Sequence, residues 1–402
     1  MDNKLTLEQK RAFYRDGYII LKNAVSQDLV EASLAQINDG KVLIDDEPYK
    51  RKEKLEKQIQ TLAANKGKLL SLEDQNPAWF SKSKELTDLV NASSLTPILQ
   101  DLMGSFDPPT LCHPAILPVT QPGNHFTTLG YRDKDMPYYG AGIHIDGSMT
   151  INAPQEAQKG TPEEIYNRYI ASGPKGDLGI SAEVIGDNIV PMFQDPDMTL
   201  GLGSFTGFAI VSLSDQTVEG CGQTSILPGA HHAVEKFFRW QRDTNNHIGV
   251  EGHGWSRLNH DVPNRCGLVY TPEAVLNQFI DESSETTPDG KHWPKPTQLL
   301  MEPGDACIKI YQMPHTGSRN ELGTESRKNV FFRLRHKKRQ PDKIVNGATD
   351  HPDRGFMGTW LDYEEGNNPW ERSKYAMCNM WHEWDGMQAV VAEEERKVAG
   401  NA

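Results

Sequence analysis

The chain has 402 residues, of which 37% are hydrophobic and 24% are charged, and its formal net charge at pH 7 is −13. This length suits one enlarged enzyme domain, and the composition supports a sizeable core rather than global disorder. An acidic chain does not attract a phosphate backbone, so nucleic acid is not expected as a partner. No apolar run reaches the ~18–20 residues of a membrane span, so no membrane partner is expected either.

The first residues, MDNKLTLEQKR, contain no hydrophobic region of the kind that a secretion signal needs. The five cysteines are scattered and form no C-x-x-C pair, so neither a zinc knuckle nor a disulfide framework is indicated. Both features favour a reduced, cytoplasmic protein.

Residues 1–107 are predicted to form a mostly helical part. Thr6 and Gln9 have the capping-box spacing, which predicts a helix from about Thr6. Gly17 is expected to end that helix, and the following stretch YIILKNAV has the composition of a short strand. Ser26 is expected to cap a second helix.

The charged stretch EPYKRKEKLEKQIQTLAANKGKLL has leucine and isoleucine at helical spacing and predicts a solvated surface helix.

From about Pro108 the chain alternates short apolar runs with Gly, Pro, Asn and Asp. The predicted strands are, in chain order, AILPVTQ, GAGIHIDGS, GFAIVSLSD, TSILPG, TQLLMEPG, ACIKIYQM and KNVFFRLRH. Many short strands with turn signals indicate a sandwich or barrel, which we place at residues 108–339. Two long irregular insertions, 151–200 and 233–295, are expected to be functional loops. Residues 340–402 are expected to form an extension, ending in a charged helix, that covers one end of the barrel.

The stretch GAGIHIDGSM contains the first candidate metal ligands, His144 and Asp146. It is flanked by Gly142 and Gly147 and is poor in helix formers, which favours a strand. On a strand, residues i and i+2 point to the same face, so the two side chains would lie together. An imidazole and a carboxylate suit a non-haem Fe(II) facial triad, which needs one more histidine.

The best candidate for that histidine is His315, in PGDACIKIYQMPHTGSRN, where a PGD turn leads into an apolar strand that ends at the histidine. Arg327 then opens the strand RKNVFFRLRH. Its planar guanidinium can hold a carboxylate through two hydrogen bonds, which suits a dicarboxylate co-substrate. Arg333 has the same strand parity as Arg327 and is the alternative anchor.

An ordered set of motifs resembles the phytanoyl-CoA dioxygenase-like family of Fe(II)/2-oxoglutarate-dependent oxygenases. The set comprises LTLEQKRAFYRDGYIILKNAV, the HID motif, FAIVSLSDQTVEGCGQTSILPGAHH, and PGDACIKIYQMPHTGSRN followed by SRKNVFF. The resemblance runs to about residue 339. It implies an α+β fold whose core is a double-stranded β-helix (jelly roll) with flanking helices and large loop insertions.

The same resemblance implies roles for four residues. His144, Asp146 and His315 would be the Fe(II) ligands and the catalytic centre, and Arg327 would bind the distal carboxylate of 2-oxoglutarate, with O2 as the second co-substrate. The chain departs from the family pattern in its enlarged loops and in the segment HTGSRN, where the family commonly has HGSGxN; the serine is shifted to Ser318.

The expected activity is hydroxylation of a small organic substrate with release of succinate and CO2. A carboxylate at Asp146 disfavours halogenation, because related halogenases have a small residue there that leaves room for chloride. Desaturation, ring closure and demethylation stay open, since the pocket decides the product. Two other classes stay open as well: a non-catalytic jelly-roll binding protein, and a cupin-type zinc or manganese enzyme that does not use 2-oxoglutarate.

Three other polar groups have simpler interpretations. His231 and His232 follow LPGA, where a helix is expected to begin, and are predicted to pack in the structure. The HPD motif at His351–Asp353 contains a proline that cannot donate to a sheet ladder, so it predicts a turn. Arg319 is predicted to be an exposed loop residue, with a contact to an acidic substrate as the alternative.

Overall fold

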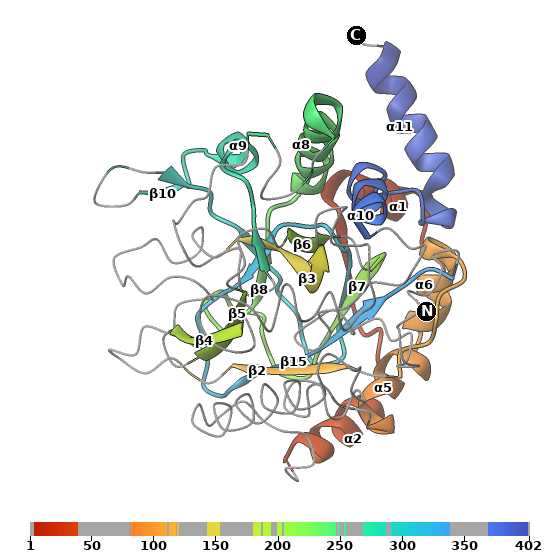
Figure 1. Ribbon diagram of the computed structural model, residues 1–402. Helices are drawn as coiled ribbons and strands as arrows, with labels where there is room; N and C mark the ends of the chain where they lie inside the picture. Colours follow the sequence, from red (N-terminus) through yellow and green to blue (C-terminus); the bar gives the residue numbers. More distant parts are fainter. Residues whose placement is uncertain are drawn as a thin grey trace, which may run out of the picture.

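The computed structural model describes residues 4–38, 81, 83–110, 112–117, 119, 143–152, 180–185, 188–193, 199–202, 205–246, 248, 253–254, 268–286, 290, 292–337 and 369–400. For 146–152, 180–185, 188–193, 199–202, 268–270 and 369–373 it describes the backbone alone. The predicted surface helix at 47–70 and the HPD motif lie outside the described residues. The described part combines helices with antiparallel sheets (Figure 1).

The first sheet has five strands in the order β1-β13-β7-β15-β2, and all its neighbours are antiparallel. Its strands are β1 (Tyr18–Leu21), β2 (His113–Leu117), β7 (Gly207–Ser212), β13 (Ala306–Ile310) and β15 (Arg327–Leu334).

The second sheet has the order β12-β8-β14-β3-β6, and a further strand, β9, pairs with β3. Its strands are β3 (His144–Asn152), β6 (Thr199–Leu202), β8 (Thr224–Ile226), β9 (Leu268–Tyr270), β12 (Thr297–Gln298) and β14 (His315–Gly317). Two separate hairpins join β4 (Ile180–Ile185) to β5 (Asn188–Phe193) and β10 (Glu285–Thr286) to β11 (His292–Trp293).

Successive core strands alternate between the two sheets. The chain passes from β2 in the first sheet to β3 in the second, from β6 through β7 to β8, and from β12 through β13 and β14 to β15. Residues that are close in sequence therefore lie on different sheets, and each sheet is assembled from strands that are far apart in the chain.

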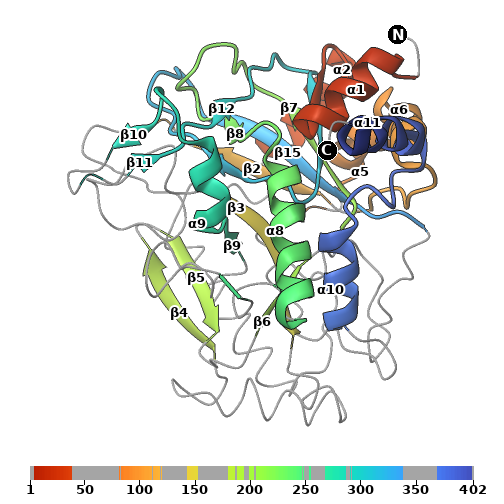
Figure 2. The ribbon, with the colours of Figure 1, turned by 90° about the horizontal axis from the view of Figure 1, so that it is seen from above.

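Helices cover the first sheet and flank the second. In Figures 1 and 2, α1, α2, α5, α6 and α11 gather on one side of the molecule, and α8 lies beside α10. The helices are α1 (Leu7–Asp16), α2 (Gln27–Asn38), α5 (Lys84–Asn91), α6 (Leu95–Met103), α8 (Ala230–Asn245), α9 (Glu273–Leu276), α10 (Pro369–Cys378) and α11 (Gln388–Gly400), with the short 3-10 turns η3 (Asn277–Phe279) and η4 (Asp385–Met387).

The beginning of the chain follows its local signals. The Thr6 side chain accepts from Gln9 N at 3.2 Å and Thr6 N donates to Gln9 Oε1 at 2.8 Å, which confirms the capping box. Gly17 ends α1 in the left-handed region, with φ of 78°. The helix expected after Ser26 is also present, whereas the strand expected over YIILKNAV stops at Leu21.

The expectation of irregular structure over 233–295 is wrong for its first part. The helix α8 extends to Asn245 and buries Val234, Phe237 and Phe238. This i, i+3, i+4 spacing is that of an amphipathic helix, so the signal was present in the sequence. The segment 151–200 likewise contains β4, β5 and the end of β3.

The C-terminal extension packs onto the N-terminal helix. The Trp384 ring lies 5.0 Å from the Phe13 ring, and the Trp381 ring lies 5.4 Å from it. An added methyl group at Gly207, the first residue of β7, would lie 3.0 Å from Trp384. The extension therefore covers the end of the first sheet at which β7 begins.

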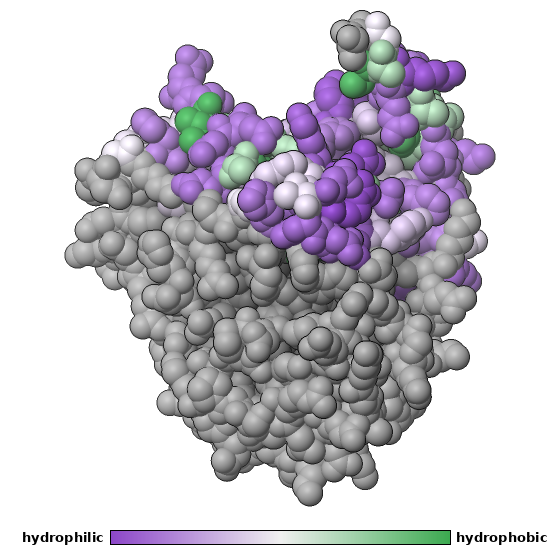
Figure 3. Space-filling model, turned by 45° about the horizontal axis from the view of Figure 1, so that its top comes forward, coloured by the Kyte–Doolittle hydropathy of each residue, from purple (hydrophilic) through white to green (hydrophobic). Residues whose placement is uncertain are grey.

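On the face shown in Figure 3, the described surface is mostly hydrophilic and its hydrophobic residues form small separate patches. Among the helices of the described part, none has both the length and the apolar character needed to cross a bilayer. The large hydrophobic residues that remain exposed are Leu7, Val218, Trp240, Leu300, Leu322, Tyr375 and Val398.

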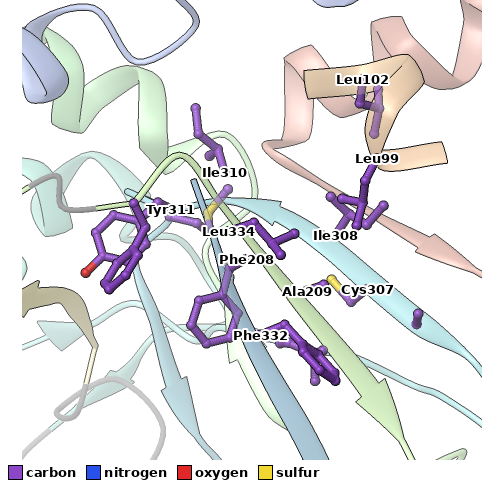
Figure 4. Close-up of a cluster of buried hydrophobic side chains, with 14 of the residues drawn as sticks. Leu99, Leu102, Phe208, Ala209, Cys307, Ile308, Ile310, Tyr311, Phe332 and Leu334 are labelled. Atoms are coloured by element: carbon purple, nitrogen blue, oxygen red, sulfur yellow. The ribbon is translucent and has the colours of Figure 1, made fainter. Parts of the chain in front are cut away.

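The hydrophobic core lies between the first sheet and its helices. Ala209 of β7, Ile308 of β13 and Phe332 of β15 are fully buried. Leu99 of α6 lies beside Ile308 (Figure 4). Because side chains alternate along a strand, this packing turns the residues of opposite parity, such as Phe208 and Lys309, toward the other face of the sheet.

Candidate functional site

The structure brings His144 and His315 together. They are Cα partners in register on the adjacent antiparallel strands β3 and β14, and their ring centres are 4.5 Å apart. His144 is half-buried and His315 is 8% exposed. Two histidines from distant parts of the sequence therefore present their rings side by side.

His315 is held in a defined orientation. Its Nδ1 lies 2.9 Å from the Met313 carbonyl oxygen, which can only accept, and 3.3 Å from Lys309 Nζ, which can only donate; the shorter contact assigns the proton to Nδ1. The Nε2 lone pair is then available to a metal ion, which is the usual arrangement for a ligating histidine. One sequence expectation is corrected: His315 does not end the strand that follows the PGD turn, since β13 stops at Ile310 and His315 begins β14.

The separation of the two rings fits binding to one ion. With metal–nitrogen bonds of about 2.1 Å, two imidazoles bound at right angles have ring centres about 4.6 Å apart. Asp146 follows on the same strand, and its backbone is paired with Leu268 of β9. Among the side chains that the structure describes, no three His, Cys, Asp or Glu residues form a metal-binding group, and the Asp146 side chain is not one of those described.

A row of three side chains crosses the first sheet beside His315. Phe208 of β7 is paired with Lys309 of β13 on one side and with Arg333 of β15 on the other. Lys309 Nζ lies 4.4 Å and Arg333 Cζ lies 5.4 Å from the centre of the Phe208 ring. Lys309 is fully buried and Arg333 is 3% exposed, so two cations lie in the interior against one aromatic ring (Figure 4 labels Phe208).

Lys309 also contacts the candidate ligand directly, since its Nζ lies 3.3 Å from His315 Nδ1. The Phe208 ring lies 6.3 Å from the His315 ring. The wall beside the histidine pair is therefore both aromatic and cationic.

Arg327 is buried at the other end of the same face of β15. Burial lowers the pKa of its guanidinium to about 10, and no charge among the described residues contributes to that shift. Nη1 donates to the Ala115 carbonyl at 3.3 Å, whereas Nε is buried and has no hydrogen-bond partner among the described residues. A buried cation of this kind is stabilised by an anion, so Arg327 is suited to binding a carboxylate.

An aromatic wall joins Arg327 to the histidine pair. Arg327 Cζ lies 5.9 Å from the Phe331 ring, and the Phe331 and Phe208 rings are 5.5 Å apart. Phe208 in turn approaches His315. A molecule that contacts both Arg327 and the histidines would lie along this wall.

The segment HTGSRN after His315 is held in place by neighbouring loops. Ser318 N donates to the Gln223 carbonyl at 2.8 Å, and its hydroxyl lies 2.5 Å from that of Ser225. Asn320 Nδ2 donates to the carbonyls of Leu117 and Glu325 at 3.2 and 2.8 Å. Both side chains therefore serve to fix the loop.

The expectation of an exposed Arg319 is wrong. Its side chain is 14% exposed and its Nη1 lies 3.0 Å from Glu321 Oε1. This ion pair holds the Arg319 guanidinium against the surface of the domain.

Sequence reasoning missed three buried polar residues near the site: Lys309, Asn329 and Gln216. Lys309 could have been noticed, because a lysine inside the apolar run ACIKIYQM lies on one face of a strand with Cys307. No sequence signal identifies Asn329 and Gln216, because they become neighbours only through the pairing of β15 with β7.

The comparisons with protein-family models and with curated protein sequences find no match. Among solved structures, the chain is similar to HygX from Streptomyces hygroscopicus with nickel and 2-oxoglutarate bound, at 11% identity and a TM-score of 0.33, over 82% of this chain and 87% of that one. It is also similar to the non-heme alpha ketoglutarate dependent carbocyclase SnoK from nogalamycin biosynthesis, at 11% identity and a TM-score of 0.37, over 86% and 92% of the two chains.

A third similar structure is EctD from S. alaskensis with bound Fe, at 12% identity and a TM-score of 0.36, over 82% and 76% of the two chains. The names of these three proteins mention bound 2-oxoglutarate with nickel, dependence on alpha ketoglutarate, and bound Fe, respectively. With TM-scores below 0.5, the likeness carries no conclusion about this chain's fold or activity.

Proposed function

We propose that the chain is an Fe(II)/2-oxoglutarate-dependent oxygenase that hydroxylates a small organic substrate and releases succinate and CO2. The observation that carries this proposal is the pairing of His144 with His315, in register on adjacent strands. The buried guanidinium of Arg327 on the adjoining wall supports it.

We also infer that the two large sheets are the halves of a double-stranded β-helix. The support is the alternation of successive core strands between two antiparallel sheets, which is typical of a jelly roll. Residues 1–402 would then form one enlarged oxygenase domain, and a cytoplasmic location stays a prediction from the sequence.

In this proposal His144, Asp146 and His315 hold the iron. Bound iron, together with 2-oxoglutarate and O2, supplies the oxidising chemistry. The Met313 carbonyl accepts from His315 Nδ1, which would leave Nε2 as the nitrogen that holds the metal. Arg327 would bind the distal carboxylate of 2-oxoglutarate, and the Phe208 and Phe331 rings would form the apolar wall beside the bound molecule.

The test is anaerobic titration of the purified protein with Fe(II) and 2-oxoglutarate. The wild type is expected to develop a weak visible charge-transfer band that is absent from His144→Ala and His315→Ala. His292→Ala, which removes an exposed histidine of β11, is the matched control and should keep the band. A wild type without the band, and with metal binding unchanged in Asp146→Ala, contradicts the proposal.

The two open alternatives give different results. A non-catalytic binding protein would produce no succinate from 2-oxoglutarate under any condition. A cupin-type zinc or manganese enzyme would keep its activity in Arg327→Ala, because no dicarboxylate is involved. Incubation with chloride is expected to give no chlorinated product, since Asp146 takes the position that a halide would need.

A further inference from the structure

The guanidinium of Arg327 is held along one edge by neutral acceptors. Its Nη1 donates to the Ala115 carbonyl at 3.3 Å and lies 3.3 Å from the amide of Asn329. A guanidinium N–H can only donate, so the Asn329 atom at this contact is the oxygen. Since Nη1 is engaged twice and Nε has no partner among the described residues, the Nε edge is the one left for a ligand.

Asn329 is itself held by a second buried amide, Gln216. Polar atoms of the two amides are 2.7 Å and 3.4 Å apart, so the groups bind each other at two points. Ser212 contacts the Gln216 side chain, and Gln223 Nε2 donates to the Gln216 carbonyl at 3.1 Å. Gln216 and Ser212 are fully buried and Asn329 is 1% exposed. The Asn329 atom that lies 2.7 Å from Gln216 also lies 3.0 Å from the Lys328 carbonyl, which can only accept, so this atom is the amide nitrogen and the oxygen faces Arg327.

We infer that the Asn329–Gln216 amide pair is a positioning device for Arg327, which keeps its Nη1 edge on the sheet and presents its Nε edge to the distal carboxylate of the co-substrate. This inference rests on the proposed function. Neutral groups are needed at both positions, because a carboxylate at position 329 would pair with Arg327 and compete with the dicarboxylate. The amide pair thereby sets the preference for a dicarboxylate over a monocarboxylate.

The inference is tested by isothermal titration of Fe(II)-loaded protein without O2, using two probes. These are 2-oxoglutarate and 2-oxopentanoate, which has a methyl group in place of the distal carboxylate. Asn329→Asp and Asn329→Leu are expected to lower the preference for 2-oxoglutarate by about tenfold or more. In both variants the Arg327 guanidinium loses the amide contact that orients it toward the distal carboxylate. Binding of 2-oxopentanoate and of Fe(II) should stay within about twofold, which a general loss of structure would not allow.

Two further variants guard against misfolding. Asn329→Ser keeps an oxygen acceptor and should recover part of the preference, and Gln216→Leu should lower it less than the Asn329 changes do. The control is Gln241→Leu. It also removes a buried amide, but that amide lies in α8 and donates to the His253 carbonyl, so the variant should keep the wild-type preference.

The failures of the two proposals are distinguishable. A wild type that binds both probes equally, or an Arg327→Ala variant that keeps the preference, overturns the assignment of Arg327 and with it the positioning role. If Arg327→Ala loses the preference but folded Asn329 and Gln216 variants retain it, the positioning role alone is overturned.

Discussion

Arg327 is a buried cation, and its surroundings indicate what the residue is suited to bind. Its charge is retained in the interior although burial lowers the pKa of the guanidinium, and its described contacts are with neutral oxygens. An arginine that only stabilised the fold would more simply be paired with an acid or exposed to water. The site therefore has the character of a binding position that is completed by an anion.

Arg327→Ala is expected to weaken 2-oxoglutarate binding by about 10- to 150-fold, which corresponds to the loss of charge-assisted hydrogen bonds. Arg327→Lys should recover only part of this loss, because an ammonium group cannot form the planar two-point contact. The measurement is the dissociation constant of 2-oxoglutarate by titration. Equal values for the wild type and Arg327→Ala would contradict the proposal that Arg327 binds the distal carboxylate.

Sequence reasoning could propose the residues whose chemistry is distinctive. His144, His315 and Arg327 could be proposed because their residue types and order suit one known kind of site. The environment of each residue could not be predicted in full: Asn329 shares a strand face with Arg327, but Gln216 reaches Asn329 only after β15 has paired with β7. Burial and orientation are properties of the assembled sheet rather than of the motif.

At the scale of elements, the junction of α1 with α8 is built from tightly fitted small and aromatic groups. His231 and His232 each place Nε2 on the Tyr14 carbonyl, at 3.0 and 2.9 Å, so both rings donate an N–H to the same oxygen. Burial is the main cause that lowers the pKa of both histidines, and that of His231 falls well below its usual value. Gly17 lies against His231, and it has no room for a side chain.

This junction predicts a loss of stability in acid. The folded state holds both histidines neutral, so the unfolded chain binds more protons once the pH falls below about 6.5, the ordinary histidine pKa. Above that pH the free energy of unfolding does not depend on these two histidines. As the pH falls toward their pKa in the folded state, the free energy of unfolding decreases by up to about 1.4 kcal/mol per pH unit for each histidine.

Urea unfolding between pH 7.5 and 5.5 measures this slope. His231→Gln keeps an N–H donor for Tyr14 but cannot titrate, so its slope should be shallower than that of the wild type. Burial raises the pKa of Glu235 in the same helix, which acts in the opposite direction in both proteins and cancels in the comparison. Equal slopes would show that His231 is not held neutral.

Gly17→Ala is expected to destabilise the protein by more than the about 1–2 kcal/mol that a left-handed backbone costs alanine. The added methyl would lie 2.5 Å from His231 Nδ1 and would also overlap Met313. The matched control is Gly290→Ala, where φ is 84° and no atom lies within 4 Å. Urea midpoints that shift equally for the two variants would show that the contact with His231 contributes nothing.

The elements that the sequence predicted are those with local signals. The capping box at Thr6 and the left-handed Gly17 act within one turn of helix, so both were predictable. The separation of β13 from β14 was not, because the backbone between Ile310 and His315 is shaped by neighbours far away in the chain. The start of α8 after LPGA was predicted, but its continuation to Asn245 was not, although Val234, Phe237 and Phe238 have helical spacing, because the sequence that follows is rich in Gly and Asn.

At the scale of the whole molecule, the two ends of the chain are joined. Lys10 Nζ lies 2.9 Å from Asp101 and donates to the Gly386 carbonyl at 3.2 Å, which ties α1 to α6 and to the C-terminal turn. Arg11 pairs with Glu393 of α11 at 2.9 Å. These contacts, with the Phe13–Trp384 packing, make separate unfolding of either end unfavourable.

Trp384→Ala is expected to lower the free energy of unfolding by about 3–5 kcal/mol, since it leaves a cavity between α1 and β7. Far-UV circular dichroism and tryptophan fluorescence should report one coincident urea transition for the wild type and for the variant. Separate transitions would show that the extension folds independently and would contradict a single enlarged domain.

The pairing of His144 with His315 has a consequence for the order of events during synthesis. β14 has three residues, His315–Gly317, and it lies between β8 and β3, both of which are made much earlier. A nascent chain that has not yet exposed residue 317 to solvent can hold only one of the two paired histidines. The two histidines can therefore come together only after β14 has been made, and a product that ends before residue 315 would carry the HID motif without its partner histidine.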